Sequence, residues 1–245
     1  VTLWDHGGGP LAGCEVAMDK DGNMTRYITL PDLRKVLNDA MTYAKDENRA
    51  NHRESDYKYD IFSFDCCLMG NAEIAYELEP FAKCMIGSEE TEPGTGWNYQ
   101  WLEVFGDTGF DNDPVKIGKK VITLYSDEDT EEAAISKWRG SDNSFRDSTL
   151  ALYDLSKINS VKEKVDALGT ALSAVYGLEN KNYYYKITKA ICNLKSYDDG
   201  ERGLVDSYLL AKTICDQIDA LDGSHQVNAL TDLKAAANDL LEVTG

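Results

Sequence analysis

Two residues in this sequence carry the chemistry of a nucleophile and its proton-transfer partner. His6 follows a strand-forming segment at residues 1–5, and Cys67 follows an apolar segment at residues 59–66. A thiolate attacks a carbonyl carbon when a nearby imidazole moves the protons, so a Cys–His pair is suited to nucleophilic catalysis. A histidine or a cysteine alone is more often structural, and only their joint placement at strand ends favours this chemistry.

Alternating strand and helix patterns position this pair. Strand-like segments and amphipathic segments with helical spacing follow one another at residues 1–5, 30–46, 59–66, 69–81 and 84–88. Such alternation predicts an α/β fold with a mostly parallel sheet, right-handed crossovers and flanking helices. Loops at the carboxyl ends of parallel strands converge on one edge of the sheet, so we expect His6 and Cys67 to meet there.

The remainder of the chain has apolar spacing without a chemical motif. Further elements are expected as a helix at 113–126, a strand at 149–153, and helices around 157–177, 183–195, 206–221 and 226–242. The 245 residues are therefore predicted to form a single domain, with an α/β core at 1–155 and a helical C-terminal portion at 156–245.

The residues around Cys67 predict how its thiol is activated. We expect Cys67 to open the following helix, where backbone N–H groups and the positive end of the dipole favour a thiolate. Gly7 lets a backbone N–H approach a substrate carbonyl, so the N–H groups of Gly7 and Cys67 form the expected oxyanion hole. No metal ligands are assigned from the sequence.

Two blocks of the sequence resemble the histidine and cysteine blocks of the clostripain family: Leu-Trp-Asp-His-Gly-Gly-Gly-Pro at residues 3–10 and Phe-Asp-Cys-Cys-Leu-Met-Gly at residues 64–70. That family belongs with the caspases, legumains and gingipains. The resemblance therefore implies a caspase-like fold and a cysteine endopeptidase, with Cys67 as nucleophile and His6 as general acid and base.

The resemblance also implies that Asp65 lies in the specificity pocket and pairs with a substrate Arg or Lys. Strand alternation supports this role, because Asp65 and Cys67 share a face while Cys66 points the other way. Capping of the following helix is the other role open to Asp65.

The segment at residues 87–97 resembles the family's loop that forms a wall of the same pocket. Its carboxylates suit a basic side chain, although a solvated acidic loop is the default for any one of them. The sequence leaves open which of Glu89, Glu90 and Glu92 points inward. The residues expected at the substrate are Asp65, Cys66, Ser88, Glu89, Glu90 and Trp97.

Lys20 and Arg26 lie in a polar, turn-rich segment of the kind that proteases cut. Related peptidases cut themselves shortly after the histidine block, so the resemblance implies self-cleavage after Lys20, with Arg26 as the less favoured site. The acidic run at 19–23 is not an EF-hand, because the positions that require Gly and Glu hold Met24 and Leu30. The chemistry requires no cofactor, and the resemblance alone allows calcium.

Net charge and hydropathy limit the kinds of molecule that this protein is expected to bind. The 43 acidic residues against 25 basic ones give a net charge of −18, which argues against nucleic acid and suits basic polypeptide substrates. No apolar stretch is long enough to span a bilayer. The family normally has strands ahead of the histidine strand, and this sequence begins at that strand without a signal peptide. The resemblance therefore implies either that a separate N-terminal chain or segment completes the sheet or that the sequence is a truncated form. The resemblance implies a secreted or cell-surface bacterial protein.

Two alternatives to an Arg- or Lys-directed peptidase remain. One is a binding module on the same scaffold that has no catalytic role. The other is a related peptidase directed at Asn or Asp, which Asp65 opposes because an anionic pocket repels an Asp side chain.

Overall fold

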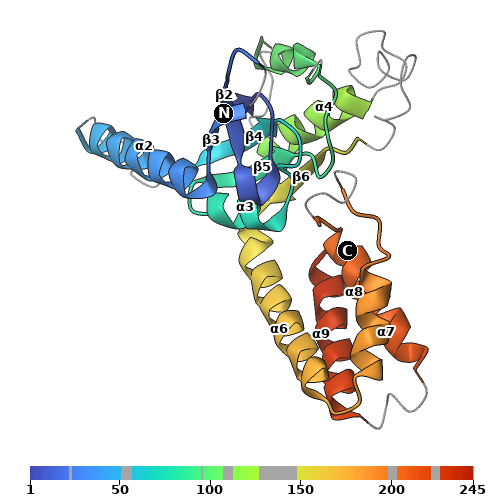
Figure 1. Cartoon of the computed structure of the whole chain (residues 1–245). Helices are drawn as coiled ribbons and strands as arrows, with labels where there is room; N and C mark the ends of the chain where they lie inside the picture. Colours follow the sequence, from blue (N-terminus) through green and yellow to red (C-terminus); the bar gives the residue numbers. More distant parts are fainter. Residues whose placement is uncertain are drawn as a thin grey trace. The chain divides into compact units, whose positions relative to one another are not determined.

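The computed structural model describes residues 1–21, 24–50, 57–94, 96–106, 113–126, 148–197, 203–221 and 227–244 (Figure 1). The chain divides into two compact units, Val1–Ser156 and Lys157–Gly245. The first contains the sheet and the residues that the sequence singled out, and the second is helical. Within the described residues, no helix has the length and apolar character needed to cross a membrane.

A four-stranded sheet forms the centre of the first unit. Its strands lie in the order β1 (Thr2–Trp4), β4 (Tyr59–Asp65), β5 (Ala82–Gly87) and β6 (Ala151–Asp154). The β1–β4 and β4–β5 pairs are parallel, and β6 runs antiparallel to β5. The predicted mostly parallel sheet is confirmed. The central strands β4 and β5 are the most apolar because they are covered on both faces, and Phe62, Phe64 and Met85 are almost fully buried.

Helices connect and flank these strands in the first unit. They are α1 (Gly9–Ala12), α2 (Leu30–Ala50), α3 (Ala72–Leu78), the 3-10 helix η1 (Tyr99–Gly106) and α4 (Pro114–Ser126). Buried side chains of α2 recur at Leu33, Leu37 and Met41, as the helical spacing predicts. On β5 and α4, Ile86, Val121 and Tyr125 form a cluster with Trp97. This cluster fixes the loop after β5 to the sheet.

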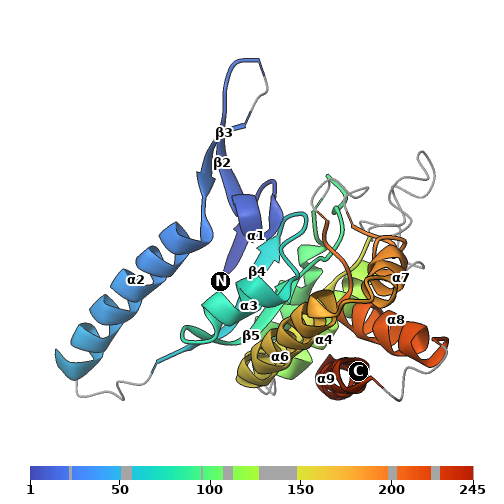
Figure 2. The same ribbon diagram turned by 60° about the horizontal axis from the view of Figure 1, so that its bottom comes forward.

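A hairpin of β2 (Cys14–Met18) and β3 (Met24–Ile28) follows α1 (Figure 2). The polar, turn-rich composition of this segment predicted turns alone, and that prediction was wrong for these two strands. The strands are short, and β2 carries the buried acid Glu15, so the apolar alternation that indicates a strand is weak. The hairpin connects to the histidine segment, because the Glu15 N–H donates to the His6 carbonyl at 2.8 Å.

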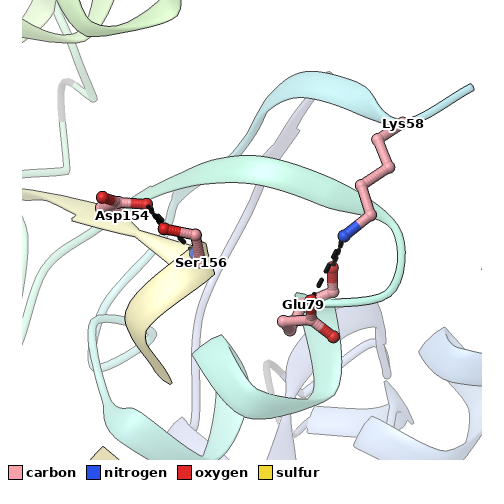
Figure 3. A network of polar contacts seen from close by, with 4 residues as sticks. All are labelled: Lys58, Glu79, Asp154 and Ser156. Carbon is pink, nitrogen blue, oxygen red and sulfur yellow. Dashed lines mark hydrogen bonds and ion pairs between the residues drawn. The ribbon is translucent and has the colours of Figure 1, made fainter. Parts of the chain in front are cut away.

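Polar contacts fix two strand ends of the sheet (Figure 3). The Lys58 ammonium, just before β4, donates to the Glu79 carbonyl at 2.6 Å and lies 3.3 Å from the Glu79 carboxylate. At the end of β6, the Ser156 N–H and hydroxyl both donate to Asp154 Oδ1, at 3.1 and 2.7 Å. The first contact joins the start of β4 to the end of α3, and the second begins the turn η3 (Leu155–Lys157).

The second unit contains α6 (Ile158–Gly177), α7 (Asn182–Ile191), α8 (Ser207–Asp219) and α9 (Asn228–Thr244). Its own core buries apolar side chains from all these helices, among them Val175, Ile187, Ile214 and Leu230. Asp206 caps α8 by accepting the Leu209 N–H at 2.6 Å. The predicted helical C-terminal portion is confirmed, within a few residues at each boundary.

Candidate active site

The register of β1 against β4 brings His6 beside Cys67. Trp4 pairs with Asp65 at the end of the parallel ladder, so the residues two further along each strand are His6 and Cys67. The backbones are in close contact there, since a Cβ added to Gly7 would lie 1.9 Å from the Cys67 carbonyl oxygen. Only glycine fits at position 7. His6 is exposed and Cys67 is half-buried, so both side chains are accessible at this edge of the sheet.

Cys67 does not open a helix, and that prediction was wrong. The helix α3 begins at Ala72, and Asn71 caps it by accepting the Ile74 N–H at 3.1 Å. The chain turns first, because Leu68 has a φ of 62° and Gly70 packs against the backbone after β5. The thiol is held instead by the Glu92 backbone, whose N–H donates to Cys67 Sγ at 3.2 Å. This donor favours the thiolate in place of the helix dipole.

The N–H group of Gly7 lies outside the ladder between the histidine segment and β2. In this bridge the Glu15 N–H donates to the His6 carbonyl and the Gly8 N–H donates to the Gly13 carbonyl, at 2.8 and 2.7 Å. Gly7 and Cys14 are therefore the pair without ladder hydrogen bonds. The Gly7 N–H is thus not used by this bridge, in a residue that packs against the Cys67 backbone.

Asp65 is buried under the loop after β5, with an exposed fraction of 3%. Its Oδ2 accepts the Trp97 N–H at 3.1 Å and the Tyr99 hydroxyl at 2.8 Å. Gly96, with a φ of 68°, lies against the carboxylate, because a Cβ there would be 2.9 Å from Oδ2. Asp65 does not cap α3, since Asn71 has that role. Its carboxylate is thus held in a fixed position under this loop, two residues before Cys67.

Glu92 is a second buried acid of this loop, and its exposed fraction is 6%. Its Oε2 accepts the Trp97 indole N–H at 3.1 Å. Burial raises the pKa of Glu92 well above its usual value, and the negative charge of Asp65 raises it further. The raised pKa favours the protonated form of Glu92. The sequence analysis left Glu92 as one of three open choices, because loop composition does not show which acid is buried.

The other predicted substrate residues have structural contacts. Ser88 is fully buried and donates to the Glu90 carbonyl at 2.7 Å. The Thr149 hydroxyl accepts the N–H groups of Glu89 and Glu90, at 2.9 and 3.3 Å. These contacts hold the loop in shape, and Trp97 is the one of this group that bonds both buried acids.

Cys66 lies on the other face of the strand end, as alternation predicts, and was included among the substrate residues without a contact to support it. Its Sγ is 3.8 Å from Cys14 Sγ and donates to the Leu3 carbonyl at 3.5 Å. The hydrogen bond with Cys14, together with burial, raises the pKa of the Cys66 thiol. Its position is that of a packing thiol beneath the hairpin.

The two predicted processing positions differ in local structure. Lys20 is exposed in the turn between β2 and β3, whereas Arg26 is an exposed residue within β3, where it pairs with Ala17. Residues 22 and 23 lie outside the described residues.

Three side chains near the dyad carry atoms that bind metals. Ligand atoms of Asp5, His6 and Glu15 all lie within 4.8 Å of one another, and they form the one such group of three found among the described residues. Calcium takes six to eight oxygen ligands. A group with an imidazole nitrogen and two carboxylates does not fit calcium, so no catalytic step is assigned to that ion.

The family model of the clostripain family, Peptidase_C11, matches residues 1–234. The chain belongs to the clostripain family. Clostripain from Hathewaya histolytica is 29% identical over 138 residues, which cover 51% of this chain and 26% of that protein. The chain thus spans about a quarter of the length of this relative.

Solved structures of clostripain-family proteases also resemble the chain. A secreted C11 cysteine protease from Bacteroides thetaiotaomicron, bound to an irreversible peptide inhibitor, is 20% identical with a TM-score of 0.44, covering 69% of this chain and 43% of that one. An inactive zymogen C11 protease from Parabacteroides distasonis is 18% identical with a TM-score of 0.44, covering 96% of this chain and 52% of that one.

Proposed function

We propose that this clostripain-family chain carries the catalytic centre of a cysteine endopeptidase that cleaves after Arg or Lys. The observation that supports the specificity most directly is the buried pair of acids, Asp65 and Glu92, beside Cys67. The pKa of Glu92 is raised because its negative charge is unfavourable here, and a bound cation would offset the charge of the two carboxyl groups. A substrate guanidinium or ammonium supplies it.

Catalysis begins when the Cys67 thiolate attacks the scissile carbonyl carbon and forms a C–S bond. The carbonyl oxygen gains the negative charge and accepts the N–H groups of Gly7 and Cys67. His6 donates its proton to the leaving amine as the C–N bond breaks, which leaves an acyl-enzyme. His6 then takes a proton from water, whose oxygen attacks the same carbon. The C–S bond breaks, which releases the acid product and restores the Cys67 thiolate beside protonated His6.

The pocket acids distinguish Arg and Lys from other residues. The Asp65 carboxylate is already aimed by the Trp97 N–H and the Tyr99 hydroxyl, so its remaining acceptor capacity can receive a guanidinium or an ammonium. Binding of that cation favours release of the proton on Glu92, because the positive charge stabilises the second carboxylate. An Asp side chain would add a third negative group, which counts against the Asp-directed alternative.

We also propose self-cleavage after Lys20, which matches the specificity of the pocket. Its exposed position at the tip of a turn is the kind of place where proteases cut, whereas Arg26 is engaged in the hairpin ladder. Sequencing of the new N-terminus tests this proposal. The cut should begin a fragment at Asp21, and it should be absent from the Cys67→Ala variant.

The activity is tested with fluorogenic peptides that differ only at the residue before the leaving group: Arg, Lys, Asn or Asp. We expect the natural full-length protein to cleave the Arg and Lys peptides, and Cys67→Ala to abolish this cleavage. Folded protein that turns over none of the peptides would favour the binding module. Cleavage of the Asn or Asp peptide instead would overturn the pocket assignment.

The proposed substrates are basic segments of polypeptides, which the net charge of −18 attracts at low ionic strength. The proposed location is outside a bacterial cell, as the description of the Bacteroides thetaiotaomicron protease states for that protein. Fractionation of the source cells, with detection of the protein in medium or at the surface, tests the location.

A further inference from the structure

We propose that Asp5, His6 and Glu15 bind a divalent transition metal ion, with zinc as the best fit, and that the bound ion silences the peptidase by occupying His6. The three side chains come from the loop after β1 and from β2. Their ligand atoms all lie within 4.8 Å of one another. Neither the dyad chemistry nor the pocket uses Asp5 or Glu15.

Glu15 points to a ligand that the protein itself does not supply. Its exposed fraction is 3%, and within the described part of the chain neither carboxylate oxygen has a hydrogen-bond partner. A buried carboxylate without donors is unfavourable unless a proton or a cation neutralises it. The position is imposed by the hairpin, since the Glu15 N–H donates to the His6 carbonyl. The fold thus holds a bare carboxylate next to the catalytic imidazole.

The other two ligands are placed to complete the site around Glu15. Asp5 Oδ1 accepts the His6 N–H at 2.8 Å, so the Asp5 carboxylate lies over the backbone of the same loop. Both Asp5 and His6 are exposed and can rotate. Ligands 2.0–2.2 Å from a tetrahedral ion lie about 3.3–3.6 Å apart, so modest side-chain rotations bring the three atoms into range.

The donor set selects the class of ion. Zinc is commonly bound by imidazole nitrogen and carboxylate oxygen in a four-coordinate site, and three protein ligands leave one position for water. Calcium and magnesium prefer sites made of oxygen ligands alone, with a larger number of ligands. Copper binds the same donors, and the usual order of affinities places it above zinc. Availability therefore decides between zinc and copper, and zinc is the probe we choose.

Binding of the ion has a direct consequence for the dyad, which rests on the proposed function. An imidazole nitrogen bound to a metal cannot accept or return a proton, so His6 can no longer protonate the leaving amine. A chelator should restore activity. Metal binding and peptidase activity are therefore linked through one residue but can be measured separately.

The experiment measures zinc binding in the Cys67→Ala background, which removes the thiol as a competing ligand. Competition with a chromophoric chelator should show one tight site per chain, and Glu15→Gln should weaken it at least tenfold. Asp39→Asn is the matched control, because Asp39 is an exposed acid whose ion pair with Lys35 lies on α2. Asp5→Asn is the second test variant, since an exposed residue puts folding at little risk.

The outcomes separate this proposal from its alternatives. Loss of the site on Cys67→Ala alone would mean that the dyad thiol holds the zinc, which overturns the proposal. Unchanged affinity in folded Glu15→Gln or Asp5→Asn protein would overturn it as well. In the active protein, zinc should inhibit cleavage of the Arg peptide reversibly, and Asp5→Asn should need at least tenfold more zinc. Tight binding in a protein without peptidase activity would refute the proposed function and leave the metal site standing.

Discussion

Replacement of Glu92 by Gln tests the two-acid pocket through stability and catalysis together. The amide keeps an oxygen that can accept the Trp97 indole N–H, and it offers Asp65 an N–H in place of the proton on Glu92. The change therefore removes the ability of residue 92 to ionise and keeps the size and hydrogen bonds of its side chain. The backbone N–H of residue 92, which donates to Cys67, is unaffected.

The sign of the effect follows from the raised pKa of Glu92, which burial and Asp65 together cause. Above the unfolded-state pKa of 4.5, the unfolded chain releases a proton that the native state retains. The free energy of unfolding of the wild type therefore falls as the pH rises, by at most about 1.4 kcal/mol per pH unit, until the native Glu92 ionises. Glu92→Gln lacks this decline, so its advantage should grow with pH.

The expected advantage at pH 8 is about 1–3 kcal/mol, the usual cost of an uncompensated buried polar group. For a unit of this size that corresponds to roughly 2–4 °C in Tm per kcal/mol. Thermal unfolding followed by circular dichroism at pH 5, 6, 7 and 8 measures it. The matched control is Glu103→Gln, an exposed acid on η1. Parallel pH profiles for wild type and Glu92→Gln would refute the reasoning.

The same variant should lose specificity while it gains stability. With one carboxylate left in the pocket, kcat/KM for the Arg peptide should fall about tenfold, or about 1.4 kcal/mol of transition-state stabilisation. Unchanged kcat/KM would show that Glu92 does not face the substrate cation, whatever its pKa.

Three further predictions concern Asp65, Gly96 and the processing site. Asp65→Asn should lower kcat/KM for the Arg peptide by about 10²-fold or more, because a charged partner contributes roughly 3 kcal/mol. Tyr99→Phe should lower kcat/KM far less. Equal losses in the two variants would contradict the role of Asp65 in substrate binding. Gly96→Ala should destabilise the first unit by about 1–3 kcal/mol, because its φ is positive and its Cβ would meet Asp65, as chemical denaturation would measure. Lys20→Gln should abolish self-cleavage, as judged by gel electrophoresis, and Arg26→Gln should leave self-cleavage unchanged. The reverse pattern would show that the processing site is Arg26 in β3.

Strands and helices whose apolar residues follow a regular spacing were predictable from the sequence. The amphipathic α2 buries side chains at helical spacing, and β4, which precedes Cys67, is a short apolar run buried on both faces. Parallel pairing then places the ends of β1 and β4, and with them His6 and Cys67, at one edge of the sheet, as the sequence predicts.

What the sequence could not supply depends on single residues in irregular backbone. The turn at Leu68, with its positive φ, separates Cys67 from α3, and spacing alone does not show it. The burial of Glu15 and Glu92 could not be predicted either, because each is an acid in a polar segment, where side chains are usually exposed. Only three-dimensional contacts distinguish these two carboxylates from their solvated neighbours.

Asp65 is held before any substrate arrives, and this has a consequence for inhibitors. Its Oδ2 already accepts the Trp97 N–H and the Tyr99 hydroxyl, so the carboxylate has little rotational freedom left to lose on binding. Much of the entropic cost of recognition then falls on the flexible side chain of the ligand. A compact ligand with its cation fixed on a rigid ring should therefore bind more tightly than arginine at equal charge.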